Sequence, residues 1–291
     1  METISVIVPT RKRPTLFSDL VRSLFKNAKY PEKIEVIALI DDDDSSYDDM
    51  KSFHPNVDWV TSRRCGIGHL TTKGIDLAAG EIVFLCNDDV LALTKNWDER
   101  FRDVHCKYED GIYLAGPNDL NKGSSLFVFP VFSRATFLAL DKFTKHYSGA
   151  YIDTHIHEIF DSLRFRGHNR IEYLEDIVFQ HKHYSVTGED PDTVYKERSK
   201  FVDDKKFFLL AANRDFCTGK LLNKLHPAKF ELEQKKLTQC GLIRSCKIYI
   251  SGKYLPRFKG MKIIFYFVAR AVLKLLATPM PWRIRRPFFT R

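Results

Sequence analysis

Residues 80–90 read GEIVFLCNDDV, an apolar run that ends in three polar residues. Because residues 82–86 include β-branched and aromatic side chains without a polar interruption, the run predicts a buried strand. Acidic side chains at the end of a central strand lie in the crevice where α/β sheets bind ligands. Their oxygens suit Mg²⁺ or Mn²⁺, which proteins hold through one or two carboxylates and substrate phosphates. Taken alone, residues 87–89 fit equally well a polar turn that caps a helix near 94–100.

The rest of the pattern predicts an α/β fold. Short apolar runs alternate with segments in which apolar residues recur at helical spacing. Strand–helix–strand alternation with short connections implies a mostly parallel sheet flanked by helices. Strands are predicted at 4–9, 34–40, 57–60, 112–115, 125–133 and 173–179, and helices at 16–25, 70–79, 134–140, 153–166 and 193–213.

Charge is distributed unevenly along the 291 residues. Residues 217–291 contain 17 Lys and Arg against two Asp and Glu, a net charge of +15, whereas the preceding part carries −6. The overall composition, 44% hydrophobic and 29% charged, is that of a globular protein. We therefore predict a domain over 1–216 and a basic helical extension over 217–291, whose charge favours an anionic partner such as membrane phospholipid or nucleic acid.

Cysteine usage and the N-terminus indicate a compartment. The six cysteines include no CxxC pair, which is typical of reduced thiols in a cytosol-like environment. The first residues, METISVIVPT, lack the basic and apolar regions of a signal peptide. No segment has the roughly 18–20 uninterrupted apolar residues of a spanning helix. We expect a cytoplasmic protein, peripheral at the inner face of a membrane.

Four segments, in order, resemble the family-2 glycosyltransferases over roughly residues 3–210. They read VIVPTRKRPTLFSDLVRSL, IEVIALIDDDD, GEIVFLCNDDV, and finally YIDTHIHEIFDSLRFRG with YLEDIVFQHKHY. The resemblance implies the GT-A fold, a Rossmann-like sheet with a nucleotide-sugar half at about 1–95 and an acceptor half at about 96–216. It also implies transfer of a sugar from a nucleotide-sugar donor to an acceptor hydroxyl, with inversion.

The resemblance implies a set of contacts to the nucleotide sugar. A solvated acidic run is the alternative for the Asp residues after the second strand, although four in succession are more than capping needs. A solvent-facing helical lysine is the alternative for Lys73. The implied contacts are Pro9, Thr10, Arg13, Asp41, Asp42, Lys73, Asn87 and Asp88.

The implied metal site departs from the family's Asp-x-Asp signature, because Asn87 stands at its first position. Asp89 is the predicted ligand, with Asp88 nearer the ribose or the metal's waters. Nucleotide phosphates would supply the charge of the missing carboxylate. His181 and His183, at i and i+2, share one face if they lie on a strand. In similar sequences a histidine here completes the metal site, so we predict His181 as a ligand of Mn²⁺ or Mg²⁺; a hydrogen-bonded structural pair is the alternative.

The base of an inverting transfer is a carboxylate on the acceptor side. Asp153, at the start of the predicted 153–166 helix, best matches the family's acidic position, and Glu158 is the second choice. Asp161 is expected to be a solvated helical residue. His155 and His157 are predicted either to bind acceptor hydroxyls or to be ordinary surface residues near the start of the helix.

The basic extension contains an apolar segment, 261–276, interrupted by Arg270 and Lys274 on one helical face. A cationic face opposite Phe, Leu and Ile predicts an interfacial membrane helix, and Trp282, Phe288 and Phe289 fit the headgroup level. The alternative is a helix packed on the catalytic domain or on a second subunit, which leaves monomer and homo-oligomer open. No nucleic-acid recognition module accompanies the charge, so nucleic acid is not expected.

The sequence thus predicts a metal-dependent glycosyltransferase, peripheral at the membrane, that acts in polysaccharide or lipid-linked glycan synthesis. The enzymatic alternative is a nucleotidyltransferase on the same sheet, which would release pyrophosphate. The non-enzymatic alternative is a degenerate domain that serves as a membrane-bound assembly subunit, an option raised by Asn87.

Overall fold

The computed structural model describes residues 1–184, 188, 190, 192–194, 201–226 and 240–275. In these residues eight strands form one sheet in the order β3-β2-β1-β4-β7-β6-β8-β5. The first four in this order are parallel, whereas β7 runs antiparallel to both β4 and β6. The strands are β1 (Ile4–Pro9), β2 (Ile34–Asp41), β3 (Val57–Ser62), β4 (Ile82–Leu85), β5 (Val90–Ala92), β6 (Leu114–Asn118), β7 (Val131–Ser133) and β8 (Ile171–His181).

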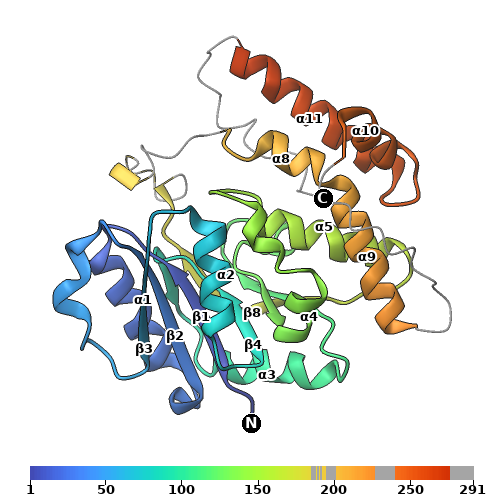
Figure 1. The fold of residues 1–291 in the computed structure, drawn as a ribbon. Helices are drawn as coiled ribbons and strands as arrows, with labels where there is room; N and C mark the ends of the chain where they lie inside the picture. The colour runs from blue at the N-terminus through green and yellow to red at the C-terminus, as the bar shows by residue number, and fades with distance from the viewer. Residues whose placement is uncertain (185–187, 189, 191, 195–200, 227–239, 276–291) are drawn as a thin grey trace.

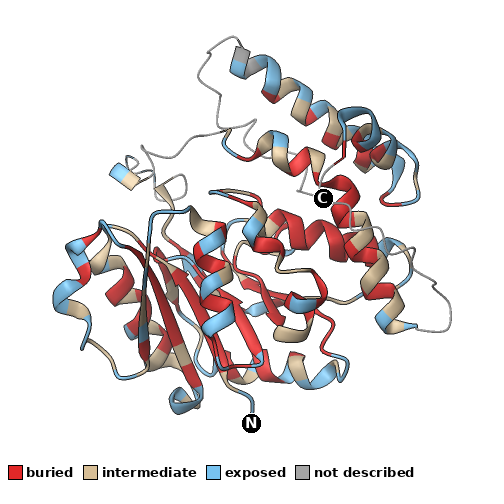
Figure 2. Cartoon of the chain, in the orientation of Figure 1, coloured by how far each residue is buried: buried red, intermediate tan, exposed pale blue. Residues whose placement is uncertain are grey.

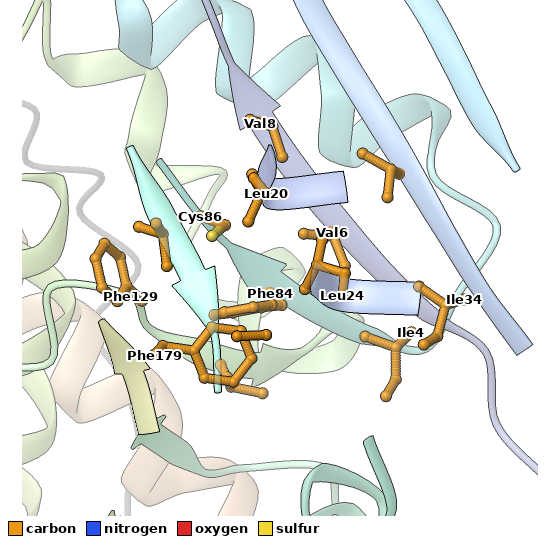
Figure 3. Close-up of a cluster of buried hydrophobic side chains, with 14 of the residues drawn as sticks. Ile4, Val6, Val8, Leu20, Leu24, Ile34, Phe84, Cys86, Phe129 and Phe179 are labelled. Carbon is orange, nitrogen blue, oxygen red and sulfur yellow. The ribbon is translucent and has the colours of Figure 1, made fainter. Parts of the chain in front are cut away.

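Helices cover both faces of the sheet, and the strands alternate their side chains between two cores. Ile4, Val6 and Val8 of β1 pack with α1 (Pro14–Asn27) and α3 (Trp97–Lys107) (Figure 3). Ile7 points to the opposite core. That core also contains residues of α2 (Ile67–Leu77), α4 (Arg134–Ala139), α5 (Ile152–Phe165) and α9 (Ala211–Leu225).

Three further helices lie beyond α5 at one end of the molecule (Figure 1). They are α8 (Asp204–Leu209), α10 (Leu242–Ile250) and α11 (Arg257–Leu275). We call residues 240–275, which include α10 and α11, the C-terminal helical unit. Its buried side chains form a small core of their own with Phe208 of α8. Among the described residues, no helix combines the length and apolarity needed to cross a bilayer.

The predicted elements are confirmed in type for most of the chain, with three corrections. The apolar run 125–133 is a strand only at Val131–Ser133, because Phe127 and Phe129 are buried in different cores without pairing. The strand predicted at 112–115 is β6, which begins at Leu114. The single helix predicted at 193–213 is interrupted by a turn at 201–203, and its residues 195–200 lie outside the described part.

The predicted boundary at 216/217 is wrong, because it falls inside α9. Cys217, Leu221 and Leu222 of this helix are buried in the core shared by α2, α4 and α5 (Figure 2). The first turns of the basic segment therefore belong to the sheet domain. The predicted headgroup-level residues Trp282, Phe288 and Phe289 lie outside the described residues.

The sequence predicted that Arg270 lies on an exposed cationic face of the helix, and this prediction is wrong. Its side chain is buried and forms a bidentate ion pair with Asp204, with Nε 2.5 Å from Oδ2 and Nη2 2.8 Å from Oδ1. The guanidinium also lies 5.3 Å from the ring centroid of Tyr266. A basic residue that recurs at helical spacing can therefore stabilise the packing of its helix on the rest of the protein, and does not have to face solvent.

Candidate active site

The acidic residues meet because three neighbouring strands end at one edge of the sheet. β1 pairs in parallel with β2 on one side and with β4 on the other. Their carboxyl ends therefore bring Thr10, Asp41 and Asp88 together, at the place where α/β sheets bind ligands. All three side chains are buried.

Arg13 is the centre of this cluster. Its Nη1 donates to Asp88 Oδ1 at 2.9 Å and lies 3.9 Å from Asp89 Oδ2. Its Nε donates to Asp192 Oδ2 at 2.7 Å. Thr10 Oγ1 donates to the second oxygen of Asp88 at 2.8 Å. One guanidinium thus lies against two adjacent buried carboxylates.

The carboxyl of Asp88 is costly to ionise in this position. Burial raises its pKa to about 6, and the positive charge of Arg13 only partly opposes the effect. The neighbouring charge of Asp89 raises the pKa further. The strand end therefore concentrates negative charge in a place that favours a bound cation.

Asp89 and His181 form a pair that fits a metal ion. His181 Nε2 lies 3.3 Å from Asp89 Oδ1, and both side chains are buried. Among the residues that the structure describes, neither ring nitrogen of His181 has a hydrogen-bond partner. In the described part of the chain no group of three or more His, Cys, Asp or Glu side chains has the arrangement to hold a metal ion by itself. Two protein ligands suit Mg²⁺ or Mn²⁺, which take further oxygens from phosphates and water.

Strand β5, which the sequence did not predict, brings Asp89 and His181 together. It is only three residues long and pairs with β8 so that Val90 lies opposite His181. The backbone N–H of Lys182 also donates to the carbonyl of Asp89 at 2.8 Å. The ring of His183 lies 5.3 Å from that of His181, so the two rings are neighbours.

The second acidic run is held by Arg11. Its Nη1 donates to Asp41 Oδ2 at 2.9 Å, and the guanidinium also pairs with the exposed Asp43. Burial raises the pKa of Asp41, with Arg11 opposing the shift. Asp42 is exposed. Pro9 ends β1 directly before Thr10.

Sequence reasoning missed Arg11, Asp192 and Tyr47. The hydroxyl of Tyr47 lies 2.6 Å from Thr10 Oγ1 and accepts the backbone N–H of Arg13 at 3.0 Å. An arginine in the basic loop after β1 could have been paired with the Asp run by charge. Nothing in the sequence marks Tyr47, which stands in a short 3₁₀ segment, Ser45–Met50.

Besides Asp42, two more of the predicted contacts to the nucleotide sugar lie at exposed positions. Asn87 is exposed beside the buried Asp88 and Asp89. Lys73 is exposed on α2, and its Nζ donates to the carbonyl of Thr61 at 3.0 Å. The structure therefore does not bring Lys73 into contact with the acidic cluster.

Asp153 stands in the first turn of α5, half-buried, and its Oδ1 accepts the backbone N–H of Thr154 at 2.8 Å. The residue before the helix, Tyr151, has a φ of +70°, which is rare for a large side chain. Its hydroxyl donates to Asp204 Oδ1 at 2.6 Å. Buried Asp203 accepts three consecutive backbone N–H groups of residues 148–150. Helix α8 thus holds the turn before Asp153.

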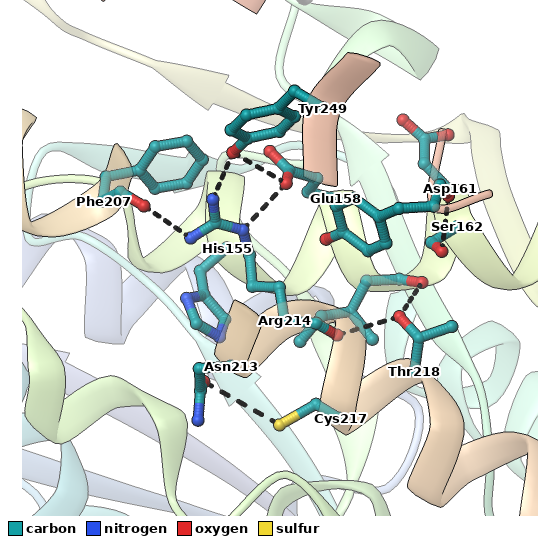
Figure 4. A network of polar contacts seen from close by, with 12 residues as sticks. His155, Glu158, Asp161, Ser162, Phe207, Asn213, Arg214, Cys217, Thr218 and Tyr249 are labelled. Carbon is teal, nitrogen blue, oxygen red and sulfur yellow. Dashed lines mark hydrogen bonds and ion pairs between the residues drawn. The ribbon is translucent and has the colours of Figure 1, made fainter. Parts of the chain in front are cut away.

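Glu158, the second choice for the base, is part of a buried network instead (Figure 4). Its Oε1 accepts from Arg214 Nε at 2.9 Å and from the hydroxyl of Tyr249 at 3.1 Å. Both charged side chains are essentially inaccessible to solvent. Since the pair joins α5 to α9 and α10, its position is that of a structural ion pair.

His155 and His157 are not surface residues, as one alternative had them, but are buried in α5. His155 Nδ1 lies 2.6 Å from the hydroxyl of Tyr147. His157 packs edge-on against Phe127. Asp161, expected to be solvated, is buried and pairs with Lys259 of α11.

The burial of His157 predicts a loss of stability in acid. Desolvation lowers its pKa from 6.5 to about 4. Between these values the unfolded chain binds a proton that the folded chain does not, so stability falls as pH falls through this window. We expect this group alone to remove about 2 kcal/mol of the unfolding free energy between pH 7 and pH 5. Urea unfolding of the wild type and of His157→Gln at pH 7 and pH 5 measures this drop in unfolding free energy. The drop should be smaller in the variant, which lacks the buried imidazole, and an equal drop in both proteins would contradict the prediction.

The acidic cluster lies at the carboxyl ends of the parallel strands, and comparison with known proteins gives the family of the chain. The model of glycosyl transferase family 2 matches residues 5–166, more than half of the chain, and the chain belongs to this family. A glucosyl-dolichyl phosphate glucuronosyltransferase of Haloferax volcanii is 27% identical over 119 residues. The match covers 39% of this chain and 37% of that protein, so it spans little more than a third of the relative.

Two solved structures share the fold. One is a mannosyltransferase from Pyrobaculum calidifontis in complex with GDP-Man and Mn²⁺, with a TM-score of 0.50 and 15% identity, over 99% of this chain and 82% of that one. The other is S. aureus TarS in complex with UDP-GlcNAc, with a TM-score of 0.54 and 15% identity, over 86% and 81%. These likenesses confirm the predicted GT-A fold.

Proposed function

We propose that this protein transfers a sugar from a nucleotide-sugar donor to an acceptor hydroxyl, with inversion, and that it needs a divalent metal. The observation that carries the proposal is the cluster of Arg13, Asp88, Asp89 and His181 at the carboxyl edge of the sheet. Membership of the family supports the reaction class. The donor half would be about residues 1–95, and the acceptor half would follow it.

The donor half would bind the nucleotide at the end of β1. Thr10 and Arg13 both donate to Asp88 there, and Asp41 lies at the neighbouring strand end. Mn²⁺ or Mg²⁺, held by Asp89 and His181, would stabilise the charge of the departing diphosphate. Arg13 would then contribute a second positive charge beside the same phosphates.

The acceptor half would supply the base. Asp153 is half-buried in the first turn of α5 and is positioned by the turn that Asp203 and Asp204 hold. Its carboxylate would remove the proton of the attacking hydroxyl as the bond between sugar and diphosphate breaks. Glu158 is not proposed for this role, because its buried carboxylate is paired with Arg214.

The proposal predicts that Asp153→Asn separates donor binding from transfer. We expect the variant to bind the nucleotide sugar with the affinity of the wild type and to lose about 10²–10⁴-fold in turnover, because only the base is removed. The assay follows nucleoside diphosphate release from a panel of nucleotide sugars with Mn²⁺ or Mg²⁺, and calorimetry follows binding. Asp215→Asn, which alters a half-exposed ion pair between Asp215 of α9 and Arg166 at the end of α5, is the matched control.

Other outcomes of this assay favour the alternatives. Release of pyrophosphate instead of nucleoside diphosphate would identify a nucleotidyltransferase. No binding of any donor with either metal would favour a non-catalytic assembly subunit. Full turnover in Asp153→Asn would contradict the assignment of the base.

The C-terminal helical unit is the basis for proposing an acceptor class and a location in the cell. We propose an acceptor in polysaccharide or lipid-linked glycan synthesis and a peripheral position at an anionic membrane surface. Residues 241–275 contain eight Lys and Arg and no Asp or Glu, and such a segment is attracted to anionic lipid. The dolichyl phosphate in the name of the Haloferax volcanii relative is consistent with a lipid-borne acceptor.

A further inference from the structure

An apolar stripe runs along α11 on the side opposite to the one that packs on the protein. Five large apolar side chains on this helix are between 48% and 68% exposed. Their spacing of three and four residues keeps them within about 80° of one another at about 100° per residue. The stripe consists of Phe258, Met261, Phe265, Val268 and Val272.

The inner face of α11 is already occupied. Ile263, Tyr266 and Arg270 are buried on it, against α8 and α10. By the same helical spacing these three residues are centred about 150° from the centre of the stripe. Figure 2 shows exposed residues on the side of α11 that faces away from α8. The helix therefore carries large apolar side chains on two faces, and the described part of the protein covers one of them.

Basic residues border the stripe. Arg257 and Lys262 lie at its two edges by helical position, and Lys262 Nζ is 4.3 Å from the ring centroid of Phe258. Arg244 and Lys247 of α10 are exposed, as are Leu242 and Ile243 on the same helix. Phe side chains with a basic border are the composition of helices that lie in the plane of a bilayer surface.

We infer that the stripe on α11 inserts into the headgroup region of an anionic lipid surface. This inference deepens the proposed function, on whose membrane location it rests. It names the side chains of the expected apolar face, and it replaces Arg270, which is buried, by Arg257 and Lys262 as the basic border. A second copy of the chain is a poorer occupant. Two such units face to face would bring together surfaces whose own charges are those of Arg244, Lys247, Lys253, Arg257, Lys262 and Lys274, and like charges disfavour the contact.

The test measures lipid binding without any need for transfer. Sedimentation with equimolar phosphatidylglycerol and phosphatidylcholine vesicles gives the partition coefficient of the wild type and of Phe258→Ser/Phe265→Ser. We expect the double variant to bind at least about tenfold more weakly, because two rings no longer enter the bilayer. Both positions are exposed, so the melting temperature should stay that of the wild type.

A matched control removes two exposed leucines elsewhere. Leu77 and Leu138 are 56% and 55% exposed on α2 and α4, and Leu77→Ser/Leu138→Ser should bind vesicles like the wild type. Vesicles of phosphatidylcholine alone should bind more weakly than the mixture, because they lack the attraction to Lys and Arg.

Three results would overturn the inference. The first is no vesicle binding by the wild type, and the second is equal binding by the wild type and Phe258→Ser/Phe265→Ser. The third is a dimer of the wild type in light scattering where the same double variant is a monomer. If vesicles do not bind but the donor is still consumed, the stripe fails and the proposed transfer stands. If vesicles bind as expected and no donor turns over, the role of the stripe stands and the proposed transfer fails.

Discussion

Replacing Asp89 by Asn will lower metal-dependent release of nucleoside diphosphate by at least about 100-fold. The change keeps the shape of the side chain and removes the negative charge that lies 3.3 Å from His181 Nε2. With a neutral amide there, the proposed metal would lose its charged protein ligand. Titration of Mn²⁺ into protein saturated with donor measures the effect, and the midpoint should move to higher metal concentration.

The control for Asp89→Asn is Asp48→Asn. Asp48 is exposed and pairs only weakly with Lys51, at 3.4 Å, outside the acidic cluster. It should leave both turnover and the metal midpoint unchanged. His181→Ala should shift the midpoint in the same direction as Asp89→Asn by a smaller amount, since imidazole is the softer ligand. An unchanged metal midpoint in Asp89→Asn would contradict the proposed site.

Replacing Arg214 by Met will lower the free energy of unfolding by about 3–5 kcal/mol. Arg214 is completely buried, and its guanidinium contacts Glu158, the carbonyl of Phe207 and the hydroxyl of Tyr249. Met fills a similar volume but leaves Glu158 as a buried carboxylate without its positive partner. Urea unfolding at pH 7 measures the loss.

Two comparisons separate this effect from ordinary loss of a charge. Arg164→Met breaks a pair with Asp161 in which Arg164 is 55% exposed, and it should cost less than about 1 kcal/mol. Arg214→Met/Glu158→Leu removes both buried charges and should recover most of the stability. A cost below about 1 kcal/mol for Arg214→Met alone would contradict a fully buried pair.

The sequence predicted the parallel half of the sheet well because local pattern and tertiary environment agree there. Strands β1, β2 and β4 are buried on both faces and read as mostly apolar runs, interrupted only by Ser5 in β1 and by Glu35 near the start of β2. The acidic residues that follow them meet for a topological reason, since parallel neighbours end at one edge. Thr10, Asp41 and Asp88 could therefore be predicted to lie together from strand order alone.

The remainder depended on contacts between distant residues, which local pattern does not reveal. Glu158 and Arg270 have the spacing of exposed helical charges, yet both are buried, Glu158 against Arg214 and Arg270 against Asp204. The run at 125–133 has the composition of a strand, but its side chains are divided between two cores. Whether an apolar or charged residue is exposed is decided by what packs over it.

The ion pair between Arg270 and Asp204 limits how this protein can be shortened. The same Asp204 carboxylate accepts the hydroxyl of Tyr151, two residues before Asp153, and Phe267 of α11 stacks on Phe207 beside it. Deleting α11, to obtain a fragment that aggregates less during crystallisation, would leave the Asp204 carboxylate without Arg270. Such a fragment would lose the exposed apolar stripe of α11, but it would also lose contacts that hold the turn before α5. Substitutions on the outer face of the helix are therefore the better route to a soluble and active form.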